Sequence, residues 1–287
     1  MSSPRGGYRS GMSSANGNGR HSPLGLIVMS VGNTRTAFGR YSHGRIERTD
    51  RLANTDLDAM AALVGQYLSE QEAAFTAAGM DAPRVAVMAS VDDAVATPLA
   101  ERARREFGAH LLWVEKDLPI PIGRRLDPES IVGQDRLLNA AAAYDGLKQA
   151  CVVIDAGTAI TVDFVDGEGT FHGGAILPGA RLQLRALFEH TDLLPEVSFD
   201  PPTPGAFGAN TVQAMRHGVF YGIRGAVRHL IERYAEFYEA YPHVIATGGD
   251  AHVLFDEDEL IEHVIDDLTL QGIAITARTA IEEEASD

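Results

Sequence analysis

The four residues Asp155–Thr158 (Asp-Ala-Gly-Thr) have side chains that suit the binding of phosphate and metal ions. A carboxylate and a hydroxyl oxygen can face a cation, and a glycine lets backbone N–H groups approach an anion. Apolar and β-branched runs, Val152–Ile154 and Ile160–Val162, flank the motif, so it is expected at a tight turn between two strands. The motif alone is weak evidence, because an ordinary β-hairpin with a hydrogen-bonding aspartate has the same pattern.

An earlier stretch of the chain repeats this pattern. The apolar run Leu26–Met29 leads into Ser30–Thr34 (Ser-Val-Gly-Asn-Thr), and a second strand-like run, Thr36–Phe38, follows. Ser30 stands at the position that Asp155 holds in the later copy. Such an internal repeat predicts two similar α/β domains, each with a glycine-containing turn after its first strand.

A third motif precedes a helix. Gly133–Arg136 (Gly-Gln-Asp-Arg) comes directly before the helical pattern of residues 137–148. An aspartate and an arginine at the start of a helix lie beside backbone N–H groups and project outward, where they can act on a bound ligand. The alternative is structural, with Asp135 capping the helix and Arg136 solvated.

These motifs need a framework of strands and helices to position them. The first half contains further strand patterns at 45–52, 84–90 and 111–114. Thr55 is predicted to cap a long amphipathic helix, with Asp58 completing a capping-box-like start. Thr97 and Pro98 are predicted to be the cap and the first residue of another helix. Three strands, a helix, a strand, a helix and a strand describe a ribonuclease-H-like domain.

The second half repeats this order after Cys151. Helices are predicted at 178–190, from Asn210 onward and at 268–281, with a short strand at 244–246. We therefore predict an α/β fold of two ribonuclease-H-like domains, each a mixed sheet flanked by helices. The predicted boundaries are a disordered tail at 1–23, a first domain at 24–148 and a second domain at 149–287 that ends in a short acidic tail.

Composition excludes several classes of partner. The net charge of -16 and the pI near 5.0 argue against nucleic acid and anionic membranes, which bind basic surfaces. No apolar run approaches the roughly 20 residues of a membrane span, and Cys151 is the single cysteine, so a reducing cytoplasmic location is expected. Cys151 is expected to be buried filler, and the histidines lack paired metal-ligand spacing.

Taken in order, the motifs resemble those of the type III pantothenate kinases. They are Ser30–Thr34, Gly133–Arg136, Asp155–Thr158, Gly173–Gly179 (Gly-Gly-Ala-Ile-Leu-Pro-Gly), Asn210–Thr211 and Thr247–Gly249. The resemblance extends from Leu24 to about Ile281, and this order and spacing are more specific than any one motif. It implies membership of the acetate kinase, hexokinase, Hsp70 and actin superfamily, in which two ribonuclease-H-like domains clamp ATP.

The resemblance also implies roles for the motif residues. The ATP phosphate loop would comprise Ser30, Val31, Gly32, Asn33, Thr34, Arg35, Thr36 and Ala37. The pantothenate contacts would be Gly133, Gln134, Asp135, Arg136 and Thr211, with Asp135 as the general base. Thr158 would contact ATP, Gly248 and Gly249 would lie on the nucleoside side, and Asp155 would bind a monovalent cation at a dimer interface.

The implied reaction is the ATP-dependent phosphorylation of pantothenate to 4'-phosphopantothenate, the first step of coenzyme A biosynthesis. It would use ATP, Mg²⁺ and a monovalent cation, K⁺ or NH₄⁺. A homodimer is expected, because the Thr211-type contact in this family reaches the partner's substrate site. The apolar face of the helix at 210–238 is also broader than one sheet would cover.

The sequence departs from the family pattern at two places. The family's first motif begins with an aspartate that faces the Mg²⁺–phosphate cluster, and this chain has the neutral Ser30 there. The family also has a substrate-contacting tyrosine before a proline, whereas Arg-Arg-Leu-Asp precedes Pro128 here. Three hypotheses follow: an active pantothenate kinase with an altered metal site, a non-catalytic ligand-binding or regulatory relative, or a kinase of another small hydroxyl substrate.

Overall fold

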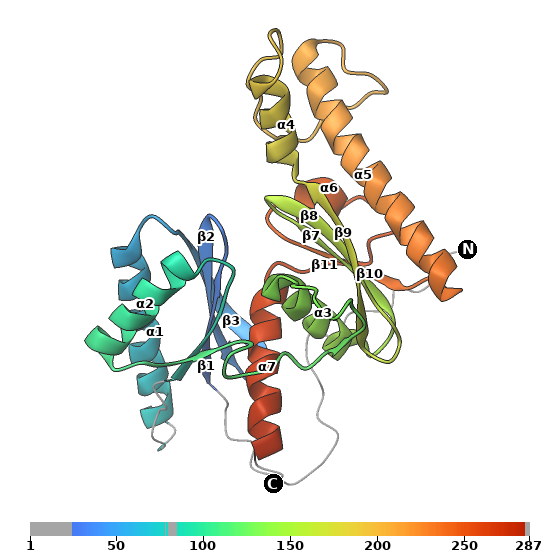
Figure 1. Cartoon of the computed structure of the whole chain (residues 1–287). Helices are drawn as coiled ribbons and strands as arrows, with labels where there is room; N and C mark the ends of the chain where they lie inside the picture. Colours follow the sequence, from blue (N-terminus) through green and yellow to red (C-terminus); the bar gives the residue numbers. More distant parts are fainter. Residues whose placement is uncertain (1–24, 78, 80–84, 285–287) are drawn as a thin grey trace. The chain divides into compact units, whose positions relative to one another are not determined.

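The computed structural model describes residues 25–77, 79 and 85–284, and the chain divides into two compact units (Figure 1). Unit 1 holds the described residues up to Pro121, then Ile131–Gly146, and the described residues from Asp267 on. Unit 2 holds Ile122–Ser130 and Leu147–Asp266. The tail predicted at 1–23 lies outside the described residues.

Unit 1 is built on a five-stranded sheet with the strand order β3-β2-β1-β4-β5. Its elements are β1 (Leu26–Val31), β2 (Arg35–Ser42), β3 (Arg45–Ala53), α1 (Leu57–Ala77), β4 (Val85–Ser90), α2 (Asp93–Phe107), β5 (His110–Trp113), α3 (Gln134–Leu147) and α7 (Leu268–Glu284). β1 runs antiparallel to β2 and parallel to β4. The predicted sequence of three strands, helix, strand, helix and strand is confirmed.

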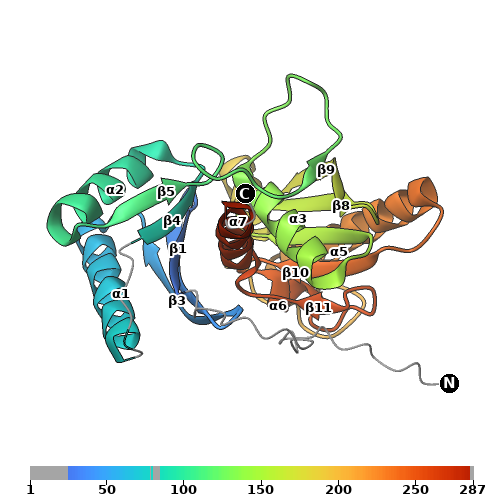
Figure 2. The same ribbon diagram turned by 90° about the horizontal axis from the view of Figure 1, so that it is seen from below.

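The central strand β1 is buried on both faces, and its side chains alternate between two layers of helices. The side chains that pack with α1 and α2 are Ile27, Met29 and Val31. The opposite face carries Val28. A Cβ on Gly39 of the neighbouring strand would lie 2.9 Å from the Val28 side chain and 3.2 Å from the Leu270 side chain of α7. Figure 2 shows α1 and α2 on one side of this sheet and α7 on the other. By the same alternation, Ser30 belongs to the face of Val28.

Helix α7 packs against strands β1, β2, β3 and β4, all in unit 1. Its close approach to α3 depends on Gly272, because a Cβ there would lie 2.3 Å from the Leu138 carbonyl oxygen. Arg278 of α7 also pairs with Asp145 of α3 at 3.0 Å. From the sequence, this stretch was predicted to belong to the second half, whereas it lies in unit 1, and the helix extends three residues beyond the predicted end at Ile281.

Unit 2 contains a six-stranded sheet with the order β11-β10-β7-β8-β9-β6. Its elements are β6 (Gly123–Arg124), β7 (Cys151–Ala156), β8 (Ala159–Val165), β9 (Thr170–Pro178), α4 (Ala180–Glu189), α5 (Thr211–Tyr238), β10 (His243–Thr247), α6 (Ala251–Phe255) and β11 (His263–Val264). Without the edge strand β6, the order and the strand directions repeat those of unit 1. The predicted duplication of a ribonuclease-H-like sheet is therefore confirmed.

The first strands of the two units, β1 and β7, correspond residue by residue. Ser30 is the fifth residue of the six-residue β1, and Asp155 is the fifth residue of the six-residue β7. Ser30 is paired with Ala37 on the neighbouring strand, and Asp155 with Thr161. The two residues therefore hold equivalent places in the two sheets.

Two helix starts differ from the prediction. Helix α1 is capped by Asp56 and not by Thr55, because the Asp56 carboxylate accepts a hydrogen bond from the Ala59 N–H at 2.9 Å. Asp58 instead pairs with Arg102 of α2.

Helix α2 begins at Asp93, where Asp92 accepts from the Ala94 N–H at 3.1 Å, so Pro98 lies inside the helix. Proline there removes one helical hydrogen bond, and burial of Ala96 and Leu99 on either side of it supports the helix. The helix predicted from Asn210 onward is present as α5, and Asn210 is its cap, since its side chain accepts from the Gln213 N–H at 3.0 Å.

Candidate active site

The first turn of unit 1 joins the end of β1 to β2. The Gly32 N–H donates to the Arg35 carbonyl at 3.0 Å and closes the turn. The Val91 N–H, just after β4, donates to the Val31 carbonyl at 3.0 Å. Ser30 is half-buried beside the small side chain of Ala89 on β4. The turn is thus held from both neighbouring strands.

The residues of this turn differ in what they present to solvent. Asn33, Thr34 and Arg35 are exposed, Gly32 and Ala37 are half-buried, and Val31 and Thr36 are buried. The Thr36 hydroxyl donates to Asn54 Oδ1 at 2.9 Å. Thr36 therefore braces the turn from the inside, whereas the exposed residues are placed to meet a ligand.

The Gly133–Arg136 motif forms the start of α3. Asp135 is the second residue of the helix, and its Oδ1 accepts from the Arg136 N–H at 2.8 Å. A Cβ on Gly133 would lie 2.5 Å from the same oxygen, so this carboxylate position requires glycine before it. The helix start holds the Asp135 carboxylate in place by this backbone contact, which does not decide between the capping and the general-base interpretations.

A pocket of about 310 Å³ lies at the carboxyl ends of β4 and β5 and reaches Gln134. Its lining residues are Ser90, Val91, Asp93, Trp113, Val114, Lys116 and Gln134. The Lys116 ammonium lies 4.6 Å from the centre of the Trp113 ring and 3.8 Å from Asp93. Apart from Gln134, these residues were not predicted from the sequence as site residues. Their position after parallel strands is the signal that could have found them, because ligands bind at that edge of α/β sheets.

In unit 2, the Thr247–Asp250 turn folds onto Asp155. Thr247 pairs with Asp155 across the strands, and the Asp250 N–H donates to the Ala156 carbonyl at 2.9 Å. A Cβ on Gly248 would lie 2.5 Å from Asp155 Oδ1, and Gly248 has a positive φ of 97°. The fold therefore brings together Asp155 and Gly248, which the sequence analysis singled out from separate motifs.

The other predicted site residues of unit 2 are exposed to solvent. Thr158 is exposed in the β7–β8 turn, and its carbonyl accepts from the Gly179 N–H at 3.0 Å. Gly249 is exposed in the Thr247–Asp250 turn, and Thr211 is the exposed first residue of α5. The Gly-Gly-Ala-Ile-Leu-Pro-Gly motif thus supports the turn that carries Thr158.

An ion pair between an exposed arginine and a buried carboxylate, not predicted from the sequence, adjoins the Thr247–Asp250 turn. Asp250 is only 2 % exposed, and its carboxylate accepts from Arg181 in the first turn of α4, at 2.6 Å to Oδ2. A buried carboxylate needs such a partner. The pair connects the predicted nucleoside turn to the start of α4.

The described residues do not form a cluster of metal ligands. Among the described residues, no group of three or more His, Cys, Asp or Glu side chains could hold a metal ion. Mg²⁺ in kinases is commonly held by one or two carboxylates together with substrate phosphates and water. A Mg²⁺ ion held in this way would not need a cluster of protein ligands.

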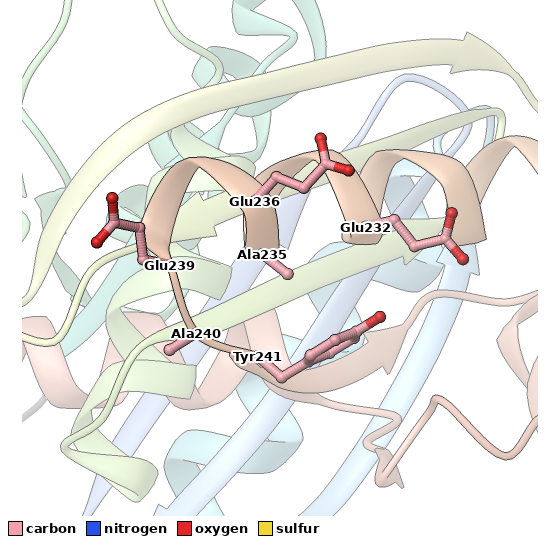
Figure 3. Close-up of a pocket in the computed structure, with 6 residues that line it drawn as sticks. All are labelled: Glu232, Ala235, Glu236, Glu239, Ala240 and Tyr241. Carbon is pink, nitrogen blue, oxygen red and sulfur yellow. The ribbon is translucent and has the colours of Figure 1, made fainter.

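A second pocket, of about 450 Å³, lies at the end of α5 and contains none of the predicted site residues. It is lined by Glu232, Ala235, Glu236, Glu239, Ala240 and Tyr241. Figure 3 shows its three glutamate side chains pointing away from one another. They do not converge on a common cation position.

Burial gives Cys151 the structural role expected of it. Its thiol is fully buried on β7, and burial raises its pKa to about 12. The thiolate required for nucleophilic chemistry is therefore suppressed near neutral pH.

In the described part of the chain, no helix has the length and apolar character needed to cross a membrane.

Solved structures establish the class of fold. The chain is similar to a conserved putative Baf family transcriptional activator from Campylobacter jejuni, with a TM-score of 0.55, 20% identity and coverage of 90% of this chain and 100% of that one. It is also similar to MreB5 of Spiroplasma citri bound to ADP, with a TM-score of 0.50, 11% identity and coverage of 92% and 99%. These similarities, with the duplicated sheets, define an actin-like α/β protein of two ribonuclease-H-like domains.

The sequence comparisons identify the family. The profile of the type III pantothenate kinase family matches residues 26–233. A type III pantothenate kinase of Desulfatibacillum aliphaticivorans is 33% identical, and the match covers 87% of this chain and 96% of that relative. The type III pantothenate kinase of Rhodospirillum rubrum is 36% identical, and the match covers 88% of this chain and 98% of that relative. The chain belongs to the type III pantothenate kinase family.

Proposed function

We propose that this protein transfers the γ-phosphoryl group of ATP to the primary hydroxyl of pantothenate, forming 4'-phosphopantothenate and ADP. The observation that carries the proposal is the family match over residues 26–233, which contains the Ser30 turn, the Asp135 helix start and the Asp155 turn. The reaction is the first step of coenzyme A biosynthesis. We propose a cytoplasmic location with it.

In this proposal, Asp135 accepts the proton from the pantothenate hydroxyl. The hydroxyl oxygen then bonds to the γ-phosphorus, and the bond from phosphorus to the bridging oxygen of ADP breaks. Arg136 pairs with the pantothenate carboxylate and orients the acceptor. Asp135 Oδ1 accepts from the Arg136 N–H at 2.8 Å, so both residues stand together at the start of α3.

Phosphoryl transfer depends mainly on positioning and charge neutralisation. The exposed part of the Ser30–Ala37 turn would contact the ATP phosphates, and Thr158, Gly248 and Gly249 would contact the nucleotide from unit 2. Mg²⁺, when bound, would neutralise the phosphate charge. We assign Asp155 as the ligand of a monovalent cation, K⁺ or NH₄⁺, because its half-buried carboxylate lies beneath the Gly248 turn.

We also propose a homodimer in which Thr211 reaches the partner's substrate site. Thr211 is exposed at the start of α5, and the exposed Gly218, Gly222 and Gly225 leave open space along the same helix. Tyr221 between them is 51% exposed. Because glycines have no side chains, the backbone of a second subunit could pack closely against this surface of the helix. Sedimentation at micromolar concentration should give the mass of a dimer, and a monomer would contradict the proposal.

Ser30 favours a second candidate, a non-catalytic ligand-binding or regulatory relative. Its neutral hydroxyl cannot supply the negative charge of the aspartate expected at the Mg²⁺–phosphate cluster. A different hydroxyl substrate is the remaining alternative, because Arg-Arg-Leu-Asp replaces the expected tyrosine before Pro128.

One assay separates these functions. The purified chain is incubated with ATP, Mg²⁺, K⁺ and pantothenate, and phosphopantothenate and ADP are measured by mass spectrometry. Equal amounts of both products support the proposal, and Asp135→Asn serves as the inactive control. ATP binding without product supports the non-catalytic relative. ADP formation with other small hydroxyl compounds, but not with pantothenate, supports the alternative substrate.

A further inference from the structure

Asn54 lies just after β3 and contacts the Gly32–Thr36 turn through three hydrogen bonds. Its Nδ2 donates to the Gly32 carbonyl at 2.7 Å, and its Oδ1 accepts from the Thr36 hydroxyl at 2.9 Å. Its backbone N–H donates to the Thr34 carbonyl at 3.1 Å. One residue therefore holds the beginning, middle and end of the turn.

These contacts determine which way the backbone of the turn faces. A trans peptide places its C=O and N–H on opposite sides. Because the Gly32 carbonyl is bound to Asn54 Nδ2, the N–H of Asn33 in the same peptide points away from Asn54. Asn33 and Thr34 are exposed, so this side of the turn is open to a ligand. Backbone N–H groups in such turns bind anions.

The side chain of Asn54 suits this task because it has both a donor and an acceptor. Thr36 is fully buried, so its hydroxyl needs an acceptor inside the protein. The carbonyl of Gly32 needs a donor in the opposite direction. An aspartate would supply only acceptors, and an apolar side chain would supply neither.

We infer that Asn54 is a positioning residue for phosphate binding, which acts through Gly32 and Thr36 rather than by touching ATP. The inference rests on the proposed function, in which this turn meets the ATP phosphates. It predicts that Asn54 affects the affinity for phosphate groups and leaves the affinity for the acceptor unchanged.

The test uses Asn54→Leu, which is similar in size and removes both side-chain bonds without adding charge. Thr55→Ala, at the exposed neighbouring residue, is the matched control. Calorimetry measures the Kd of Mg²⁺–ATP and of inorganic tripolyphosphate, and initial rates give the KM for pantothenate. Asn54→Leu should raise both Kd values about tenfold, which is the effect expected when the Gly32 carbonyl loses its hydrogen bond and is left unsatisfied. The pantothenate KM and the control should match the wild type.

A double variant separates positioning from stability. Thr36→Val combined with Asn54→Leu removes the buried hydroxyl that the single variant leaves without an acceptor, so the melting temperature should recover in part. The phosphate affinity should stay low, because the Gly32 carbonyl is still unbound. Recovery of affinity together with stability would show a merely structural role and overturn the inference.

The remaining outcomes distinguish this inference from the proposed function. Wild-type affinity of Asn54→Leu for both phosphate ligands would overturn the inference. A wild-type chain that binds Mg²⁺–ATP but forms no phosphopantothenate would refute only the proposed function, since binding alone measures the role of Asn54. A wild-type chain that binds neither ATP nor tripolyphosphate would overturn both.

Discussion

Ser30→Asp should raise kcat, because it places a carboxylate in unit 1 where Asp155 stands in unit 2. Both residues are the fifth of a six-residue first strand. Ser30 is half-buried between Ala37 and Ala89 on the neighbouring strands, and these small side chains leave room for a longer one. The substitution therefore changes the charge at the turn with little change in packing.

The magnitude follows from what such a charge does in phosphoryl transfer. An electrostatic group that faces developing charge is worth roughly 10²–10³ in kcat, about 2.7–4 kcal/mol. Without a metal, a half-buried carboxylate at this position whose oxygens are left unsatisfied costs about 1–3 kcal/mol of folding stability. In a chain of this size, each kcal/mol corresponds to about 2–4 °C in Tm. Mg²⁺–ATP should restore that stability.

Initial rates at a series of Mg²⁺ concentrations measure the effect, and thermal melts with and without Mg²⁺–ATP accompany them. Ser42→Asp is the control, because it adds the same charge at the other end of β2, away from the turn. Ser30→Asp should show a higher kcat and a lower Mg²⁺ requirement, and Ser42→Asp should show neither. A Ser30→Asp protein that folds, binds Mg²⁺–ATP and transfers phosphate no faster than the wild type would refute the reasoning.

Three further predictions concern single residues. Asp135→Asn should lower kcat by roughly 10²–10⁴ with little change in the Kd of ATP, because the base acts on the acceptor hydroxyl. Comparable losses in kcat and in ATP affinity would indicate a purely capping role. Arg136→Ala should mainly raise the KM for pantothenate, and a fall in kcat at constant KM would contradict the carboxylate contact. Asp56→Ala should lower the free energy of unfolding by about 1 kcal/mol in urea melts. Thr55→Ala should leave it unchanged, and equal effects would contradict the assignment of the cap.

Much of the fold could be predicted because local patterns report local structure. The runs around Ser30 and Asp155 showed the same strand, glycine turn and strand in each half, and both sheets follow from that repeat. The helix start at Asn210–Thr211 was predicted correctly, since the Asn210 side chain caps N–H groups within the first turn that follows it. The family resemblance was also visible from motif order alone.

Helix starts were less predictable where several capping residues stand close together. Thr55 and Asp56 are adjacent, and the geometry of the chain leaving β3 places the Asp56 carboxylate on the Ala59 N–H. Pro98 resembles a first helical residue, yet Asp92 starts the helix earlier because tertiary packing of the helix outweighs the loss of one hydrogen bond.

By itself, the sequence determined the duplicated α/β architecture, the family and the residues of the motifs, because these depend on periodicity and on the order of short segments. Only the tertiary structure decided that Gly248 lies against Asp155 and that Asn54 holds the turn after Ser30. It also decided that α7 packs on the first sheet. These contacts join segments far apart in the chain, and their partners are selected by the fit of close-packed surfaces, such as the missing Cβ of Gly272 against the Leu138 carbonyl.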